Sequence, residues 1–353
     1  MSETSRSLLA HTPVELKQAF IELGAKPFHA KIAREALLQG GAMDYASMTA
    51  LPAGLRERLP AAIPLLTSTV VDSVKAKDGT IKLLLRFPRV EGKDALVETV
   101  HIPPLRSHDA EGQPKGATLC VSTQVGCPVA CPFCASGLDG LTRNLEAHEI
   151  VEQYVHGRQV GPLSRSVVMG IGEPLLNVAN LQSAMQVVHE EIGLGARKIT
   201  VSSVGFPDRL RRLADDKPPF QLAISLHTPF DEQRAELVPA MSAVPIDDIL
   251  AAGDYWFQVT GREVTYEIVL LGGTTDTYEH ADYLATRLHG RRCSVNLIPY
   301  NPTAGLGYER PHQADVDGFR DHLIDAGLIA TVRWSRGLEG SAACGQLRAQ
   351  TLA

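Results

Sequence analysis

A regular alternation of short apolar runs with amphipathic helical stretches, from about residue 118 onward, most constrains the fold of this chain. Runs rich in β-branched residues predict strands at 118–124, 166–172, 198–203, 220–227, 264–271, 293–300 and 329–335. Between them, apolar residues at helical spacing predict helices at 146–159, 177–191, 207–216, 246–260, 276–290 and 313–327. Repeated βα units of this kind predict an α/β fold whose parallel sheet is doubly wound or curled into a barrel.

The remainder of the chain has a different texture and divides the sequence into four expected parts. Residues 1–63 carry apolar residues at helical spacing and predict a small helical unit. Residues 64–112 contain short alternating runs separated by turn residues, which predict an antiparallel β extension ending in a polar loop. The βα core follows at 113–336, and residues 337–353 are expected to form a mobile loop and tail, because Gly337, Gly340 and Gly345 give this segment conformational freedom.

The composition predicts a cytosolic protein. The N-terminal stretch is polar, with no basic segment leading into an apolar run, and no stretch approaches the length of a membrane span. In a reducing compartment, clustered thiols are more often metal ligands or catalysts than structural disulfides. The net charge of −6 argues against a nucleic acid bound by overall charge alone, so an RNA partner would require a local basic surface.

Four of the six cysteines gather in the segment "CVSTQVGCPVACPFC". Cys127, Cys131 and Cys134 have the spacing Cys-x3-Cys-x2-Cys, and Cys120 stands just upstream. Three close thiolates can hold three irons of a [4Fe–4S] cube and leave the fourth iron open to a small molecule. A zinc site completed by Cys120 or a histidine, or thiols that merely cluster, are the alternatives.

Polar residues follow several predicted strands, where α/β folds place their functional loops. They are Glu173, Ser203, His227 and Asn301. Taken alone, His227 is more often a satisfied strand-end histidine than a ligand.

The cysteine spacing, with Phe133 before the last thiol, resembles the signature of radical S-adenosylmethionine (SAM) enzymes. The segments "TLCVSTQVGCPVACPFCASG", "GIGEPLLN", "SLHTPFDEQRAELVP", "LIPYNP" and "RGLEGSAACGQL" follow the order seen in the RlmN/Cfr family of RNA methyltransferases. The front end, in "PFHAKIAREALL" and "MTALPAGLRERL", is similar to the RlmN branch. The resemblance implies a partial (β/α)6 radical SAM barrel, with the helical unit at 1–63 serving RNA binding.

The implied activity is methylation of carbon 2 of an adenosine in 23S rRNA, and of a tRNA adenosine in some members. Three alternatives stay open. Members of the Cfr branch methylate carbon 8 of the same rRNA adenosine. Other radical SAM enzymes act on different substrates, and a non-enzymatic RNA-binding protein could use the cysteines for a structural metal.

The resemblance also implies specific roles for two further thiols and one carboxylate. Cys344 would accept a methyl group from SAM and bond to the adenine through it, because carbon 2 is too electron-poor to attack SAM directly. Cys120 would resolve that adduct by forming a transient disulfide with Cys344. Glu98 would accept the proton that leaves carbon 2, although a glutamate in such a segment is otherwise a solvated strand residue.

The cofactors and partners follow from the same resemblance. One [4Fe–4S] cluster would be held by Cys127, Cys131 and Cys134, and two SAM molecules would be consumed per methylation. The SAM contacts would come from Gly172, Glu173, Ser203, Ser225, Leu226, His227 and Asn301. We expect 23S rRNA, tRNA and an electron donor such as flavodoxin as partners, no membrane association, and a monomer.

Overall fold

A mixed sheet of ten strands forms the centre of the computed structural model, which describes residues 6–90, 93–105 and 115–349. The first three strands and their junction with β4 are antiparallel, and the strands from β4 onward run parallel. In spatial order they are β1 (Thr69–Lys75), β2 (Ile81–Val90), β3 (Lys93–Ile102), β4 (Ala117–Cys120), β7 (Leu163–Val168), β8 (Ile199–Ser203), β9 (Gln221–Ser225), β10 (Val264–Leu270), β11 (Cys293–Pro299) and β12 (Ala330–Val332). The predicted α/β class with a central parallel sheet is therefore confirmed.

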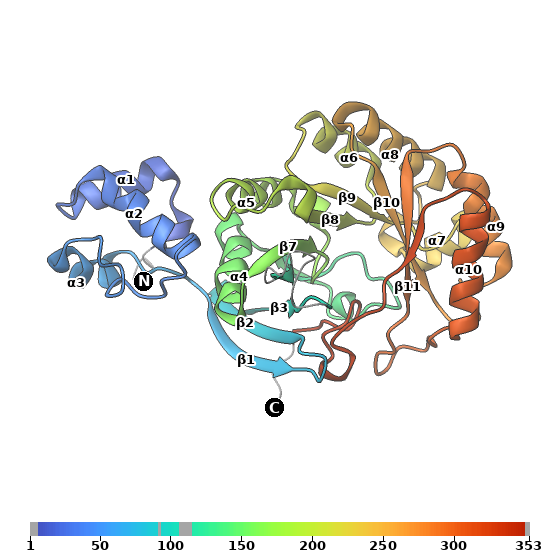
Figure 1. Cartoon of the computed structure of the whole chain (residues 1–353), viewed down its shortest axis with the longest axis horizontal. Coiled ribbons are helices and arrows are strands. Elements are labelled where there is room, and N and C mark those ends of the chain that lie inside the picture. Colours follow the sequence, from blue (N-terminus) through green and yellow to red (C-terminus); the bar gives the residue numbers. More distant parts are fainter. Residues whose placement is uncertain (1–5, 91–92, 106–114, 350–353) are drawn as a thin grey trace.

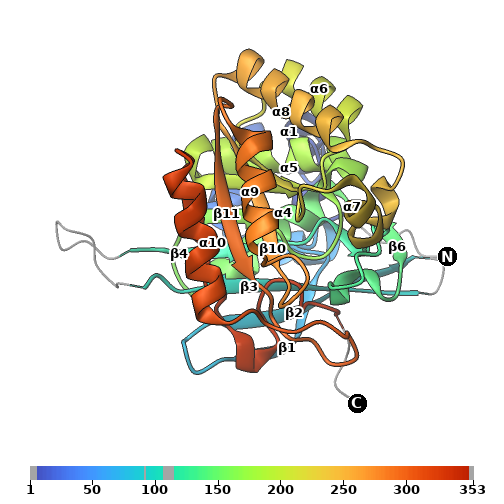
Figure 2. The same cartoon turned by 90° about the vertical axis from the view of Figure 1, so that its right-hand side faces the viewer.

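Helices cover the outer side of the curved parallel region (Figures 1 and 2). They are α4 (Ala147–Val160), α5 (Val178–Glu190), α6 (Pro207–Asp215), α8 (Ile246–Thr260), α9 (Tyr278–Leu288) and α10 (Gln313–Asp325). Large side chains such as Trp256, Tyr154 and Phe220 are fully buried between helices and sheet. Full burial of an apolar side chain contributes about 1.5–3 kcal/mol, so this layer stabilises the scaffold that carries the site.

Three elements beyond the predicted ones lie near the cysteines or after β9. The expected strand at 118–124 is split into β4 and β5 (Gln124–Gly126), and β5 pairs with β6 (Leu141–Asn144) as a separate hairpin. The short helix α7 (Asp231–Leu237) follows β9. Strands of three or four residues carry too little periodicity to be recognised in a sequence. Short 3₁₀ turns occur at Leu8–Ala10, Ala135–Gly137, Pro174–Asn177, Ala196–Lys198, Pro239–Met241 and Leu338–Gly340.

The N-terminal region consists of α1 (Pro13–Glu22), α2 (Pro27–Leu38) and α3 (Ala53–Ala62), which lie beside α4 and α5 (Figure 1). Its connection to the sheet is fixed by the buried carboxylate of Glu152 on α4. That carboxylate accepts hydrogen bonds from the backbone and hydroxyl groups of Thr67 and Ser68. A second contact joins α2 to the end of α5, where Arg34 forms an ion pair with Glu191.

None of the helices within the described residues is both long and apolar enough to cross a membrane. The expected boundary between the β extension and the βα core, at residues 112–113, lies outside the described residues.

Candidate active site

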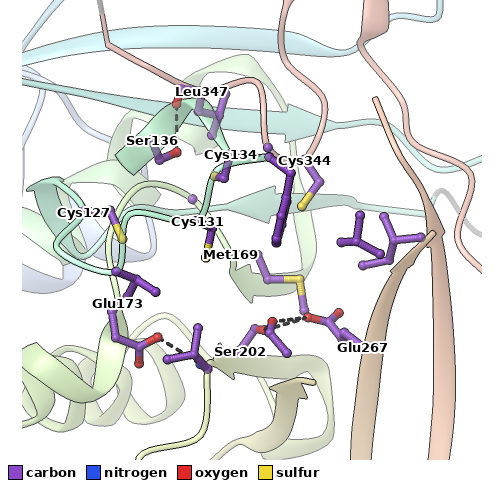
Figure 3. Close-up of a pocket in the computed structure, with 18 of the residues that line it drawn as sticks. Cys127, Cys131, Cys134, Ser136, Met169, Glu173, Ser202, Glu267, Cys344 and Leu347 are labelled. Carbon is purple, nitrogen blue, oxygen red and sulfur yellow. Dashed lines mark hydrogen bonds between the residues drawn. The ribbon is translucent and has the colours of Figure 1, made fainter. Parts of the chain in front are cut away.

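A cavity opens where the parallel strands reach their carboxyl ends, and the three clustered cysteines line it (Figure 3). The structure brings the predicted strand-end residues to the same cavity. Its lining includes Gly172, Glu173, Ser203, Ser225, His227 and Asn301. Leu226 differs, because its side chain is fully buried in the core and only its backbone takes part in the strand-end geometry.

The hairpin of β5 and β6 holds the cysteine loop in place. The Cys127 N–H donates to the Gly140 carbonyl at 3.0 Å, and the Cys134 N–H donates to the Cys131 carbonyl at 3.0 Å. Gly126 has φ +77°, and a Cβ at this position would lie 2.0 Å from the Gly140 oxygen. Only glycine therefore allows the two strands to approach this closely.

Burial determines the chemistry of the three thiols. It raises the pKa of Cys127 to about 12 and raises the pKa values of Cys131 and Cys134. Buried thiols of this kind ionise when a bound metal supplies the compensating positive charge. The described residues contain no group of three or more His, Cys, Asp or Glu side chains compact enough for a single metal ion. Three thiols spread around one cavity fit a larger iron–sulfur group.

Glu173 forms a rigid wall of the cavity. Its carboxylate accepts the Ser203 hydroxyl at 2.6 Å and the backbone N–H groups of Leu175 and Val204 at 2.9 and 3.0 Å. Burial raises the pKa of Glu173, and these three donors oppose that shift. The contacts link the loop after β7 to the end of β8.

His227 lines the same cavity in a strained conformation. Its φ of +69° is in the left-handed region, which costs a residue with a Cβ free energy and is found most often at functional sites. The ring packs edge-on against Phe133, with centroids 5.0 Å apart. Burial, with a smaller effect of the Arg234 charge, lowers the pKa of His227 to about 3, so the imidazole is neutral.

Glu267, a buried carboxylate in the middle of β10, was not predicted from the sequence. It accepts the Ser202 hydroxyl at 2.6 Å, and its other oxygen lies 4.0 Å from the Arg333 guanidinium (Figure 3 shows the Ser202 contact). Arg333 also donates to the sulfur of Met169 at 2.9 Å. A glutamate within the apolar run "VTYEIVLL" was the available signal, because a buried carboxylate requires partners.

Cys344 connects this cavity with a second one. It lines the cavity of the three cysteines and also an adjoining cavity that contains Cys120, Met169 and Arg333. Cys344 as a whole residue is exposed to solvent. Its thiol group, however, is surrounded by protein, and this burial raises the pKa of the thiol to about 12. The structure therefore places Cys120 and Cys344, distant in sequence, at one cavity.

Main-chain contacts hold the tail around Cys344 against the cysteine loop. The Ala135 N–H donates to the Gly345 carbonyl at 2.8 Å, and the Ser136 hydroxyl donates to the Leu347 carbonyl at 2.8 Å. The Asn301 amide donates to the Cys344 carbonyl at 3.0 Å. Asn301 thereby touches the predicted methyl-accepting residue as well as lining the cavity.

Glu98 lies in a third, neighbouring cavity rather than beside the three cysteines. Its carboxylate pairs with Lys82 at 2.6 Å and accepts the backbone N–H groups of Arg348 and Ala349 at 2.8 and 3.1 Å. The tail thus covers the carboxylate in this conformation. Lys82 and the backbone of residues 348–349 together occupy both oxygens of the carboxylate.

Comparisons with known proteins agree over nearly the whole chain. Residues 121–284 match the family model of the Radical SAM superfamily. A protein of Rhodopirellula baltica named "Probable dual-specificity RNA methyltransferase RlmN" is 44% identical over 95% of this chain and 88% of its own. A protein of the same name from Nostoc punctiforme is 40% identical over 97% of this chain and 93% of its own. The crystal structure of a radical SAM methyltransferase from Sphaerobacter thermophilus, 40% identical, covers 98% of this chain and all of its own with a TM-score of 0.88.

Proposed function

Because this chain belongs to the RlmN family of radical SAM RNA methyltransferases, we propose that it methylates carbon 2 of an adenosine in 23S rRNA, and an adenosine in tRNA. The observation that carries the proposal is the position of Cys344, between the cavity of the three cysteines and the cavity of Cys120. A methyl group carried on Cys344 can face the cavity of the three cysteines, and the Cys120 thiol, which would release it, lies in the second cavity.

Cys127, Cys131 and Cys134 would hold a [4Fe–4S] cluster, with SAM bound against Gly172, Glu173, Ser203, Ser225, His227 and Asn301. When bound, these cofactors supply a methyl group and a carbon-centred radical, and two SAM molecules serve each methylation. Leu226 contributes through its backbone, because its N–H donates to the Glu267 carbonyl and its side chain lies in the core.

The chain's own side chains perform the remaining steps. Cys344 carries the methyl carbon, which would give one hydrogen atom to the carbon-centred radical and then form a C–C bond to carbon 2 of adenine. Glu98 accepts the proton that leaves carbon 2, once the tail has released its carboxylate, and the unpaired electron left on the adduct would pass to the oxidised iron–sulfur cluster. The Cys120 thiolate then attacks the Cys344 sulfur. An S–S bond forms, the C–S bond breaks, and the released carbon takes up a proton as the new methyl group.

The partners follow from the chemistry. A reductant such as flavodoxin would deliver electrons and reduce the Cys120–Cys344 disulfide, and the enzyme would act as a cytosolic monomer. The adenine must leave its stack to reach Cys344, so a single-stranded or flipped nucleotide is the expected target. The helical unit at 1–63 would provide additional RNA contacts.

The test separates the two thiols. Cys344→Ala should accept no methyl group and form no product. Cys120→Ala should be methylated but stall with RNA covalently attached through Cys344, which a denaturing gel of the protein isolated from cells detects. Cys293→Ala, which alters a buried thiol on β11, is the matched control and should turn over without a crosslink. Free turnover by Cys120→Ala, or a crosslink in Cys344→Ala, would contradict the assignment.

Two further measurements define the reaction. Mass spectrometry of the modified nucleoside distinguishes methylation at carbon 2 from methylation at carbon 8. Replacement of Cys127, Cys131 or Cys134 by alanine should abolish bound iron after anaerobic reconstitution. Retention of a full cluster by the triple variant would refute the cluster assignment.

A further inference from the structure

Trp334, two residues after the end of β12, presents an aromatic ring at the cavity that contains both reactive thiols. Its side chain lines this cavity together with Cys120, Cys344 and Met169. The residue is 44% exposed, whereas the other tryptophan of the chain, Trp256, is fully buried in the core. A large aromatic ring exposed at a reactive cavity is a candidate binding surface.

A guanidinium group lies over the Trp334 ring. The guanidinium of Arg310 lies over it, 5.6 Å from the ring centroid. Arg310 is itself oriented by hydrogen bonds to the carbonyl of Tyr300 and to the amide oxygen of Asn301, at 3.4 and 3.3 Å. A cation over one face fixes the ring orientation, and the exposed remainder stays accessible to a planar group.

Two more arginine residues lie at the cavity of Trp334. Arg333 and Arg336 flank Trp334 in the sequence and line the same cavity. Asp78 neutralises part of this charge through its ion pair with Arg336, and Glu267 lies 4.0 Å from Arg333. An aromatic ring bordered by guanidinium groups is the arrangement with which proteins hold unstacked bases, the ring carrying the base and the cations the phosphates.

We propose that Trp334 stacks on the flipped purine base of the RNA substrate and so positions that base at Cys344. The inference rests on the proposed function, because it takes RNA as the substrate. It adds a residue to the substrate site, since the SAM cavity is lined by a different set of residues and Trp334 is not among them. Stacking requires no base-specific hydrogen bond, so Trp334 holds the base while the reacting atoms determine which carbon is methylated.

The experiment measures the affinity of the reconstituted full chain for a fluorescein-labelled RNA stem–loop with one unpaired adenosine, by anisotropy at fixed salt. Trp334→Leu keeps apolar bulk but removes the π face, and should weaken binding by about fivefold to a hundredfold. Trp334→Phe keeps an aromatic face and should bind nearly as well as the wild type. Tyr283→Leu is the matched control, because Tyr283 is 49% exposed on α9 and should not contact the base. Thermal unfolding verifies that each variant is folded.

Intrinsic fluorescence provides an independent readout. RNA should quench the emission of Trp334 in the wild type, and Trp334→Phe, which retains only the buried Trp256, should show no RNA-dependent quenching. Quenching by SAM in the absence of RNA would overturn the inference, because it would place the ring in the cofactor site. Equal RNA affinity of Trp334→Leu and the wild type would also overturn it. Failure of every form, the wild type included, to bind this RNA would instead contradict the proposed function.

Discussion

Gln153 on α4 holds together the loop that follows β4, although it does not line the cavity of the three cysteines. Its amide oxygen accepts the Ser122 N–H at 2.8 Å, and its amide nitrogen donates to the Ser122 carbonyl at 2.8 Å. The Ser122 hydroxyl in turn donates to the Glu98 carbonyl and accepts the Ile171 N–H. One buried amide therefore ties together the strand of Glu98, the strand of Cys120 and the loop that leads to Gly172.

Gln153→Leu should destabilise the protein strongly. It removes both hydrogen bonds and leaves the Ser122 N–H and carbonyl buried without these partners, at about 1–3 kcal/mol each, so the expected loss in unfolding free energy is about 2–6 kcal/mol. Gln159→Leu is the matched control on the same helix. The Gln159 amide is exposed and donates to the Gly41 carbonyl at the surface, so its replacement should cost no more than about 0.5 kcal/mol.

Gln153→Glu converts the same position into a pH-dependent one. The glutamate oxygen that faces the Ser122 carbonyl must carry a proton to replace the amide donor, so its folded-state pKa is raised above the ordinary value of about 4.3. The favourable interaction is then fully present below about pH 4.3 and is lost as pH rises through the folded-state pKa. Relative to the wild type, the stability of this variant should fall between about pH 5 and pH 8, by up to about 1.4 kcal/mol per pH unit.

Urea unfolding of the full chain, followed by circular dichroism at several pH values, measures both effects. Iron content after reconstitution then reports whether the displaced loop still assembles the site. The reasoning would be refuted if Gln153→Leu and Gln159→Leu had the same unfolding free energy, or if the stability of Gln153→Glu relative to wild type did not change with pH.

Two further predictions concern the scaffold. Glu152→Leu should lower the unfolding free energy by about 2–6 kcal/mol, because the backbone N–H groups of Thr67 and Ser68 lose their acceptor. Limited proteolysis should then cut between the N-terminal helices and β1, and protection equal to that of the wild type would contradict this prediction. His227 has a φ of +69°, and asparagine tolerates this left-handed region better than alanine does. In urea unfolding, His227→Asn should therefore be more stable than His227→Ala by about 1 kcal/mol. Equal stability of the two variants would argue against backbone strain at this position.

The parts of the fold that could be predicted from the sequence are those with local signals. The parallel strands are short apolar runs bounded by glycine and polar residues, and their order along the chain sets their neighbours once βα units are assumed. Cys127, Cys131 and Cys134 lie within eight residues of one loop, so the sequence also predicted that they would line one cavity. The polar residues after each strand reach that cavity because the strands run parallel and end together.

The parts that could not be predicted depend on contacts between distant segments. Glu267, Gln153 and Arg333 matter through partners that lie far away in the sequence, and their local context resembles an ordinary strand or helix. The β5–β6 hairpin is too short for a periodic pattern. Backbone N–H groups of residues 348–349 cover Glu98. Every non-proline residue has such a group, so this contact could not be predicted from the residue types.

The contacts of the tail link the position of Cys344 to the loop that carries the three clustered cysteines. Ala135 and Ser136, directly after Cys134, hold the carbonyl groups of Gly345 and Leu347, and Arg348 pairs with Asp139 in the same loop. Whatever orders the cysteine loop therefore also orders the tail, because both share these hydrogen bonds. Uncovering Glu98 breaks two hydrogen bonds that backbone N–H groups donate to its carboxylate. A hydrogen bond to a charged group contributes about 1.5–3 kcal/mol, compared with about 0.5–1.5 kcal/mol net for a typical bond. Contacts with RNA can offset this cost. The hydrogen bonds to Glu98 and those to the cysteine loop are separate contacts, so residues 348–349 can leave Glu98 while the Gly345 carbonyl stays bonded to the cysteine loop and Cys344 stays at the cavity.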